Sequence, residues 1–311
     1  MCGIAGIIHR GRSGNVGQEM TAMLQALKHR GPDSTGFAVY GAPGRDELLM
    51  RLKLAEQDEM RRGFGIFETI RARRDEVERR MRGLGAEVLE AEEVTDYAFR
   101  YRLKYDGDLK RFAAYIEDVD GAEVLSLGHA LELVKDLGDA ARVSEQYNLR
   151  QFHGTHAIGH TRMATESDVD IRSAHPFWAF PFRDVSVVHN GQLTNYWRKR
   201  RELERRGMRF QSDCDSELIA VYVADKMNQG QAFEDALRRS VEEFDGVFTY
   251  LVATRDSLGM AKDSMAAKPM VLYESDKLIA MASEEMAIRS IFPHEIDTFD
   301  PYDGEVRVWK T

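Results

Sequence analysis

Cysteine is scarce in this chain, with only Cys2 and Cys214 among 311 residues. Two cysteines cannot form the framework of several disulfides that is typical of small secreted domains. They also cannot supply the four thiolates that usually hold an iron–sulfur cluster. The cysteine content therefore indicates a reducing, cytoplasmic setting.

Long apolar runs are missing as well. No stretch approaches the roughly 20 apolar residues that a membrane-spanning helix needs. The apolar run at residues 3–8 is too short for the core of a signal peptide and has no basic flank before it. With 7 prolines, no polar low-complexity tract and 43% hydrophobic residues, we expect a globular chain that does not enter a membrane.

Positive charge is in deficit. The 43 Lys and Arg residues against 52 Asp and Glu give a formal charge of −9, which argues against a general nucleic-acid binder because phosphate contacts need a surplus of cations. A local basic patch on the charge-rich stretch described below stays compatible with this charge. Neither a P-loop nor a glycine-rich dinucleotide fingerprint occurs. We therefore expect no cofactor on this chain.

The hydrophobic pattern predicts an α+β protein. Short apolar runs predict strands at residues 3–9, 36–40, 157–162, 185–189, 247–254 and 270–273. Apolar residues at helical spacing predict helices at residues 16–29, 195–206, 216–227 and 232–243. Paired strands with helices before and after them predict stacked antiparallel sheets covered by helices.

A charge-rich stretch, residues 55–150, interrupts this pattern and predicts an inserted module between two parts of one domain, residues 1–54 and 151–311. Its order is strand, helix (71–82), two strands (87–92 and 95–103), helix (108–116) and strand (123–127). That order is the ferredoxin-like pattern, although an all-helical lid also fits parts of it. The arginines of residues 71–82 suit either a solvated helix face or a docking surface for an acidic partner.

Cys2 is the first candidate for chemistry. If Met1 is removed, Cys2 carries a thiol and a free α-amine, which are a nucleophile and a base on one residue. If Met1 stays, the amine becomes an amide nitrogen that cannot act as a base. A lone Cys2 is most simply an accident of the terminus, so its meaning depends on the rest of the chain.

Four further clusters have both a functional and an ordinary structural interpretation. Residues 159–165 (GHTRMAT) end a predicted strand with an arginine that suits a carboxylate, or a surface ion pair. Residues 189–191 (HNG) suit an oxyanion hole or a hairpin turn. Residues 213–217 (DCDSE) suit an ammonium site or a helix N-cap. The ordinary structural interpretation of residues 29–34 (HRGPDS) is a helix stop followed by a turn.

Together with Cys2, these motifs resemble the class II glutamine amidotransferases, which are N-terminal-nucleophile hydrolases that release ammonia from glutamine. The opening Cys-Gly-Ile, residues 30–33 (RGPD), 159–162 (GHTR), 174–177 (AHPF), 189–191 and 215–217 (DSE) occur in the family's order. Residues 261–263, 268–269 and 282–284 resemble the family's closing strands. The chain departs from the family at Met163, where relatives often have an aromatic residue, and at the insert. The resemblance implies a four-layer αββα sandwich.

For catalysis, the resemblance implies that Cys2 is the nucleophile and its own α-amine the base. Asn190 and Gly191 correspond to the residues that bind the oxyanion. Cys214 is most simply a small apolar filler.

For the substrate, L-glutamine, the resemblance implies that Arg162 and Thr165 hold the α-carboxylate. Asp215 corresponds to the residue that receives the α-amino group, with Asp213 as the competing candidate. Arg30 corresponds to the residue that orders the loop around the nucleophile.

The chain ends where the hydrolase domain is expected to end, so the acceptor reaction is expected on another chain. The resemblance, including the insert, extends to the amidotransferase-like subunit of N-methylglutamate synthase and of split glutamate synthase complexes. It implies a hetero-oligomer with a flavin-bearing synthase subunit, which holds FMN and an iron–sulfur cluster, and a Gly-rich β-helix subunit. The alternatives are a catalytically silent scaffold and a free-standing amidase.

Overall fold

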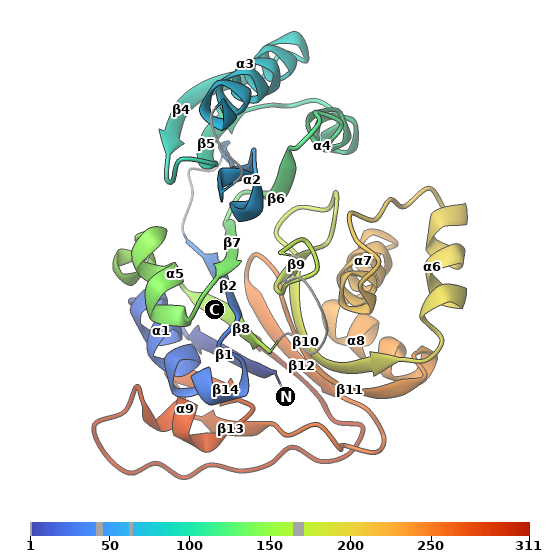
Figure 1. Cartoon of the computed structure of the whole chain (residues 1–311). Coiled ribbons are helices and arrows are strands. Elements are labelled where there is room, and N and C mark those ends of the chain that lie inside the picture. Colours follow the sequence, from blue (N-terminus) through green and yellow to red (C-terminus); the bar gives the residue numbers. More distant parts are fainter. Residues whose placement is uncertain (1, 42–45, 62–64, 164–170) are drawn as a thin grey trace.

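The structure is a computed structural model that describes residues 2–41, 46–61, 65–163 and 171–311 (Figure 1). Two antiparallel sheets pack face to face in the main domain, and helices cover the outer face of each sheet. This is the four-layer αββα arrangement, so the predicted fold class is confirmed. No helix among the described residues is long and apolar enough to cross a membrane.

The first sheet has six strands, and its middle strands come from the predicted motifs. In spatial order they are β13 (Val271–Glu274), β14 (Leu278–Ala282), β1 (Gly3–His9), β8 (His156–Arg162), β2 (Ser34–Tyr40) and β7 (Leu131–Leu137). β1 pairs with β8 so that Gly3 faces Thr161, which brings the N-terminus beside the end of β8. The second sheet has the order β15 (Val306–Lys310), β12 (Ser257–Lys262), β11 (Gly246–Ala253), β10 (Ser186–Leu193) and β9 (Phe177–Trp178).

Helices on both outer faces bury apolar stripes against the sheets. On the first sheet lie α1 (Val16–Ala26), α5 (Ala140–Gln146) and α9 (Glu285–Arg289), with the short 3-10 turns Lys28–Arg30 and Leu149–Gln151 near them. On the second sheet lie α7 (Asp215–Asn228) and α8 (Phe233–Glu243), with α6 (Tyr196–Arg205) packed against α7. Asn15 is the N-cap of α1, and its side chain accepts a hydrogen bond from the Gln18 amide.

The insert is a separate four-stranded sheet with helices on one face (Figure 1). Its elements are β3 (Leu48–Lys53), α2 (Gln57–Arg61), α3 (Ile66–Gly83), β4 (Glu87–Glu93), β5 (Ala98–Lys104), α4 (Leu109–Glu117) and β6 (Glu123–Gly128). The strand order β4-β5-β3-β6, antiparallel throughout, is the ferredoxin-like topology. An all-helical lid is therefore wrong for this segment.

The boundaries of the insert differ from the expected 55–150. β3 starts the insert's sheet at Leu48, and β7, which follows β6 after a short corner, pairs with β2 in the main sheet. The Asp184 carboxylate holds that corner by accepting hydrogen bonds from the amides of His129, Ala130 and Leu131 at 3.0, 2.8 and 2.9 Å. Asp184 lies far away in the sequence, so the local pattern could not mark where the chain returns to the main domain.

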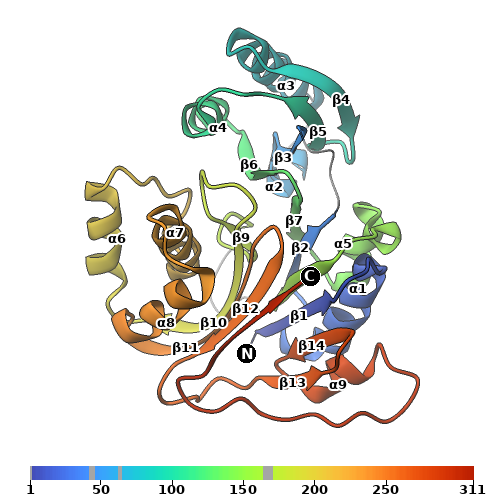
Figure 2. The same ribbon diagram turned by 180° about the vertical axis from the view of Figure 1, so that it is seen from behind.

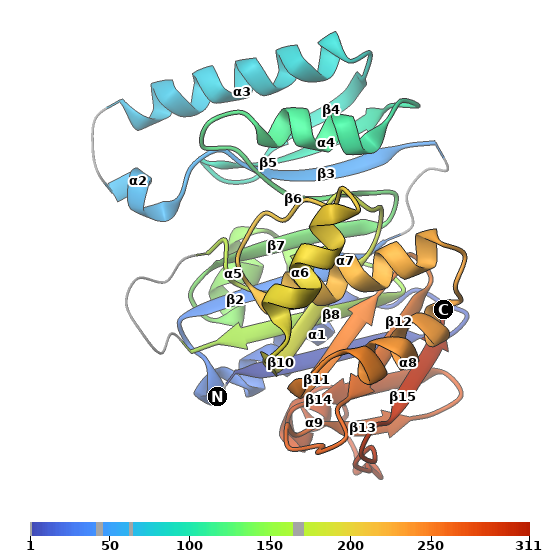
Figure 3. The same ribbon diagram turned by 90° about the vertical axis from the view of Figure 1, so that its right-hand side faces the viewer.

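The arginines of α3, which lies on the outer face of the insert in Figure 3, are largely neutralised within the insert. Arg79 and Arg80 both pair with Glu76, at 2.6 and 2.7 Å. Glu78 pairs in the same way with an arginine one turn before it and one turn after it. Exposed pairs of this kind on one helix contribute only a few tenths of a kcal/mol each. Their main consequence is that α3 presents less free positive charge than its sequence indicates.

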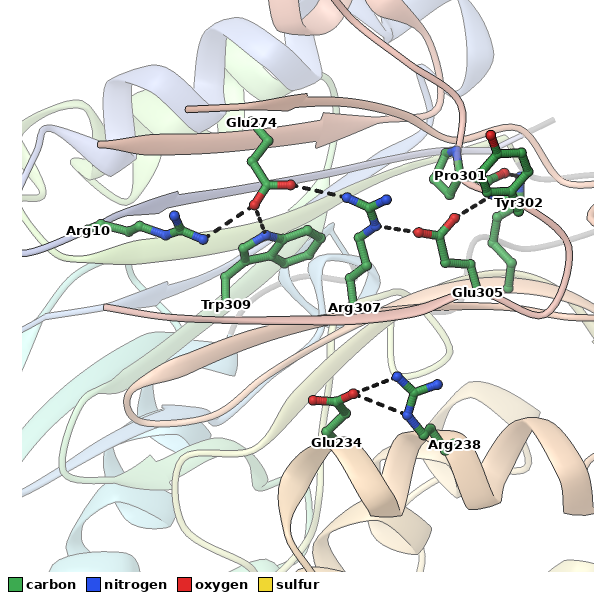
Figure 4. Close-up of polar contacts among 10 residues, drawn as sticks. Arg10, Glu234, Arg238, Glu274, Pro301, Tyr302, Glu305, Arg307 and Trp309 are labelled. Carbon is green, nitrogen blue, oxygen red and sulfur yellow. Dashed lines mark hydrogen bonds and ion pairs between the residues drawn. The ribbon is translucent and has the colours of Figure 1, made fainter. Parts of the chain in front are cut away.

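A polar network ties the two main sheets together through β13 and β15, which are edge strands of the first and the second sheet; β15 is the red strand that ends at the marked C-terminus in Figure 2. Glu274 of β13 accepts hydrogen bonds from the Trp309 indole at 2.8 Å and from Arg307 at 3.1 Å, both on β15 (Figure 4). Arg10, which follows β1, reaches the same carboxylate at 3.3 Å. Because the partners come from both sheets, this carboxylate fixes the layers relative to each other.

Candidate functional site

A cavity of about 490 Å³ opens at one end of the sandwich, where β1, β8, β10 and the start of α7 meet. Its lining includes the described residues that the sequence singled out, namely Cys2, Arg30, Arg162, Asn190, Gly191 and Asp215. Thr165, the remaining candidate, lies outside the described residues. Five segments that are far apart in the chain therefore meet in one cavity of a size typical of small-molecule sites.

Cys2 is half-buried, and its backbone is held from two sides. Its carbonyl oxygen accepts a hydrogen bond from Arg30 Nε and another from Asn190 Nδ2, each at 3.1 Å. Asn190 Nδ2 also lies 3.3 Å from the Ser283 hydroxyl, and Ser283 in turn receives the Ile4 amide at 3.0 Å. The start of β1 is therefore fixed against both β10 and the end of β14.

Two glycines allow the backbone to come this close. Gly191 has a φ of 142°, and a Cβ there would lie 2.0 Å from the Val247 carbonyl oxygen. A Cβ on Gly31 would lie 2.4 Å from the carbonyl carbon of Arg162. Only glycine fits at either position, which explains why the turn at Gly31 can pack against the end of β8.

Arg30 is anchored by a carboxylate that sequence reasoning had not assigned to the site. Arg30 Nη1 lies 2.5 Å from Glu284 Oε1, and His29 Nε2 lies 3.0 Å from Glu284 Oε2. Burial by itself would raise the pKa of Glu284, but the hydrogen bonds from Arg30 and His29 outweigh it and lower that pKa. The only sequence signal for this residue was its place in the Ala-Ser-Glu motif at 282–284.

Asp215 and Asp213 both line the cavity, but they differ in their partners. Asp213 has an 80% exposed side chain that pairs with Arg200 at 2.9 Å. Asp215 is the first residue of α7, and one of its oxygens accepts the Leu193 amide at 2.8 Å. Asp215 is thus the better-fixed carboxylate of the two.

Cys214, between these aspartates, is not a competing nucleophile. Burial, together with the negative charge of Asp215, raises the pKa of its thiol to about 11. A thiol with such a pKa is protonated near neutral pH and therefore unreactive.

Three histidines, of which His160 and His189 are buried and His175 is partly buried, form a wall of the cavity that sequence reasoning had not assigned. The rings of His160 and His175 stack with centroids 4.1 Å apart. Ser216 Oγ connects His175 and His189, since it lies 2.6 Å from His175 Nε2 and 2.9 Å from His189 Nδ1. Burial lowers the pKa of His160 to about 3 and also lowers the pKa of His175 and of His189. The wall is therefore polar but uncharged near neutral pH.

The charges in the cavity have both signs. Arg162 and Lys268 supply positive charge, and Asp213 and Asp215 supply negative charge. Such a lining suits a zwitterion, since a carboxylate and an ammonium group both find an opposite charge. Among the described residues, no group of three or more His, Cys, Asp or Glu side chains is arranged to hold a metal ion.

Comparisons with known proteins point in one direction. A family model described as a glutamine amidotransferase domain matches residues 160–290. A protein of Methanothermobacter thermautotrophicus named "Putative glutamine amidotransferase" is 40% identical over the whole of both chains. The Rhizobium meliloti protein named "Glutamine amidotransferase-like protein GlxB" is 31% identical over 93% of this chain and 91% of its own length.

A solved structure shows the same fold. The glutamine phosphoribosylpyrophosphate amidotransferase from B. subtilis superposes with a TM-score of 0.61 at 17% identity. The match covers 99% of this chain and 47% of that one, so this chain spans about half the length of that structure.

Proposed function

Because the chain belongs to the class II glutamine amidotransferases, we propose that it hydrolyses glutamine through a thioester on Cys2. The thiolate attacks the side-chain amide carbon of glutamine, the C–N bond breaks, and ammonia leaves with a proton. Water then hydrolyses the thioester to glutamate and restores the thiol. The observation that carries this proposal is the meeting of Cys2, two oxyanion candidates, an arginine and a carboxylate in one cavity.

Each of these residues has a distinct role in the proposal. Asn190 and Gly191 stabilise the negative oxygen of the tetrahedral intermediate, since the Asn190 amide already lies against Cys2. Arg162 binds the α-carboxylate of glutamine and Asp215 its α-ammonium group. Arg30 holds the Cys2 backbone in place and contacts no reacting atom in this scheme.

The α-amine of Cys2 takes the proton of its thiol, which requires that Met1 be removed. A free α-amine titrates at about pH 8, close to working pH, where a general base is most efficient. The three-histidine wall does not compete for this role, because desolvation lowers the pKa of each imidazole below its usual value and so makes it a weaker base.

At a finer level, we propose that the chain is the amidotransferase subunit of a glutamate-synthase-type complex such as N-methylglutamate synthase. A flavin-bearing subunit with FMN and an iron–sulfur cluster then receives the ammonia or the glutamyl group, and a Gly-rich β-helix chain completes the assembly. The support is the resemblance of the motifs and the insert. The matches to these two relatives, which cover at least 91% of either chain, also fit a subunit of this kind.

Replacing Cys2 by Ala tests the nucleophile. Glutamate release from glutamine should fall by about a thousandfold or more, because the covalent intermediate can no longer form. A glutamine analogue that carries an electrophile should label Cys2 and leave Cys214 unmodified, as mass spectrometry of the intact chain and its peptides would show. The same spectra report whether Met1 is present.

Three outcomes separate the candidate functions. Glutamate release by the Cys2→Ala variant at the wild-type rate would show that another residue is the nucleophile. Full turnover by the isolated chain would favour a free-standing amidase. No turnover despite a free Cys2 amine, in the presence of the partner chains, would identify a scaffold.

A further inference from the structure

The insert and the wall of the cavity are joined by hydrogen bonds at the edge of one strand. β6 is an edge strand of the insert's sheet, and it lies next to the main domain (Figure 1). The carbonyl of Ala122, just before β6, accepts a hydrogen bond from Arg172 Nη2 at 3.2 Å. The carbonyl of Val124 accepts one from Gln211 Nε2 at 3.0 Å. Carbonyls two residues apart in an extended chain point the same way, so both side chains bind the same edge.

Each of these two side chains belongs to a segment that continues directly into the cavity wall. Arg172 is followed by Ser173 and His175, which both line the cavity. Gln211 is followed by residues 213–216, which also line it. The edge of β6 therefore contacts both segments within a few residues of the substrate site.

The Gln211 segment is rigidly connected to α7. The buried Glu217 carboxylate accepts the Gln211 amide at 2.6 Å and the Ser212 amide at 2.8 Å. Arg200 donates to the Ser212 carbonyl at 2.7 Å from the other side. A shift of Gln211 would therefore move residues 211–214 and, with them, the start of α7, where Asp215 lies.

The Arg172 segment is held with equal firmness. Lys135 Nζ lies 3.0 Å from the Arg172 carbonyl and 3.0 Å from Glu123 Oε1 of β6, and both Lys135 and Glu123 are buried. The void between the insert and this part of the main domain is only about 10 Å³. A close-packed junction transmits a displacement instead of absorbing it.

We propose that the insert is a positioning module for the cavity, in which the edge of β6 fixes Arg172 and Gln211 and thereby sets the two wall segments that hold the substrate. Gln211 is a positioning residue, since it acts on the start of α7, where Asp215 lies, and contacts no reacting atom. The inference rests on the proposed function in one respect, namely that glutamine occupies the cavity.

The variant Gln211→Leu removes the donor and keeps a side chain of similar size. We expect KM for glutamine to rise about threefold to tenfold, the equivalent of one lost hydrogen bond, with kcat within about twofold. Amides in residues 212–217 should exchange hydrogen faster, while peptides elsewhere in the main domain stay unchanged. A side chain with only a general stabilising role would lower the melting temperature without raising KM.

Three further variants complete this test. Glu117→Ala removes, from the insert side, the carboxylate that accepts the Val124 amide at 2.7 Å, and it should also raise KM. Glu117→Gln keeps an acceptor and should restore the wild-type KM. The matched control Arg209→Gln breaks the exposed pair with Asp118 at the same junction and should leave KM and exchange unchanged.

Unchanged KM and unchanged exchange in both Gln211→Leu and Glu117→Ala would overturn the proposal. If the wild-type chain released no glutamate, the proposed function would fail. The exchange measurement would then still decide the role of β6: faster exchange in residues 212–217 supports it, and unchanged exchange refutes it.

Discussion

Glu117, at the end of α4, should make the stability of this protein decrease as the pH rises. The carboxyl is largely buried at the junction between the insert and the main domain and accepts the Val124 amide at 2.7 Å. Burial raises its pKa from 4.5 to about 7, against the hydrogen bond from Val124, and the negative charge of Glu123 adds to the effect of burial. The folded protein thus favours the protonated form of this side chain.

The sign and size of the effect follow from linkage. A carboxyl with a higher pKa in the folded than in the unfolded chain contributes stability that is fully present below about pH 4.5. That stability is lost as the pH rises through about 7. The difference between 4.5 and about 7 corresponds to roughly 3 kcal/mol at most. Relaxation of the site reduces this limit, so we expect about 1–3 kcal/mol.

Glu117→Gln isolates this contribution, because the amide stays neutral at every pH and still accepts the Val124 hydrogen bond. Urea unfolding at about pH 5 and about pH 8 gives the free energy of unfolding of both proteins. The variant should gain about 1–3 kcal/mol relative to wild type between the two pH values. Glu87→Gln, at an exposed position of β4, is the control and should show no such gain. An equal difference between Glu117→Gln and wild type at both pH values would refute the reasoning.

Two further predictions concern the substrate and the sheets. Asp215→Asn, which still accepts the Leu193 amide, should raise KM for glutamine about tenfold or more through loss of the negative charge. Arg162→Lys should weaken glutamine binding by roughly 1–3 kcal/mol through loss of the planar guanidinium fork. Unchanged KM in both variants, measured by steady-state kinetics, would place glutamine elsewhere. Glu274→Ala should cost about 1–2 kcal/mol of unfolding free energy, because it leaves the Trp309 indole and two arginines without their shared partner. The control Glu234→Ala breaks an exposed pair with an arginine on α8 and should cost less than about 0.5 kcal/mol in the same unfolding experiment. Equal losses in these two variants would show that the network does not join the sheets.

The reactive residues and the strands that carry them could be read from the sequence. Local apolar runs defined β1, β8 and β10, and the predicted motifs lie at the ends of these strands or within them. Local pattern also predicted α3, α4 and the strands β4, β5 and β6 of the insert, with the ferredoxin-like order that the structure confirms, whereas the short helix α2 was not predicted. Such features depend on neighbours within a few residues, which a sequence shows directly.

The site itself contains residues that local pattern could not connect. Glu284 meets Arg30 across 254 positions, and Ser216 joins His175 and His189 across 41 and 27 positions. Each of these residues also has an ordinary structural interpretation, as a turn, a cap or a core histidine. Only their packing around one cavity distinguishes a role in the site from the ordinary structural role.

The sequence by itself determined the fold class, the nucleophile candidate and the existence of an insert, because hydrophobic period and residue chemistry are local properties. The tertiary structure alone decided where the insert ends and what it touches. β7, placed within the insert by its sequence neighbours, pairs with β2, whose sequence lies about a hundred positions earlier. The sequence also could not predict the contacts of Arg172 and Gln211 with the edge of β6. Every residue has a backbone carbonyl, and only the packing of the insert against the main domain decides which side chain binds which carbonyl.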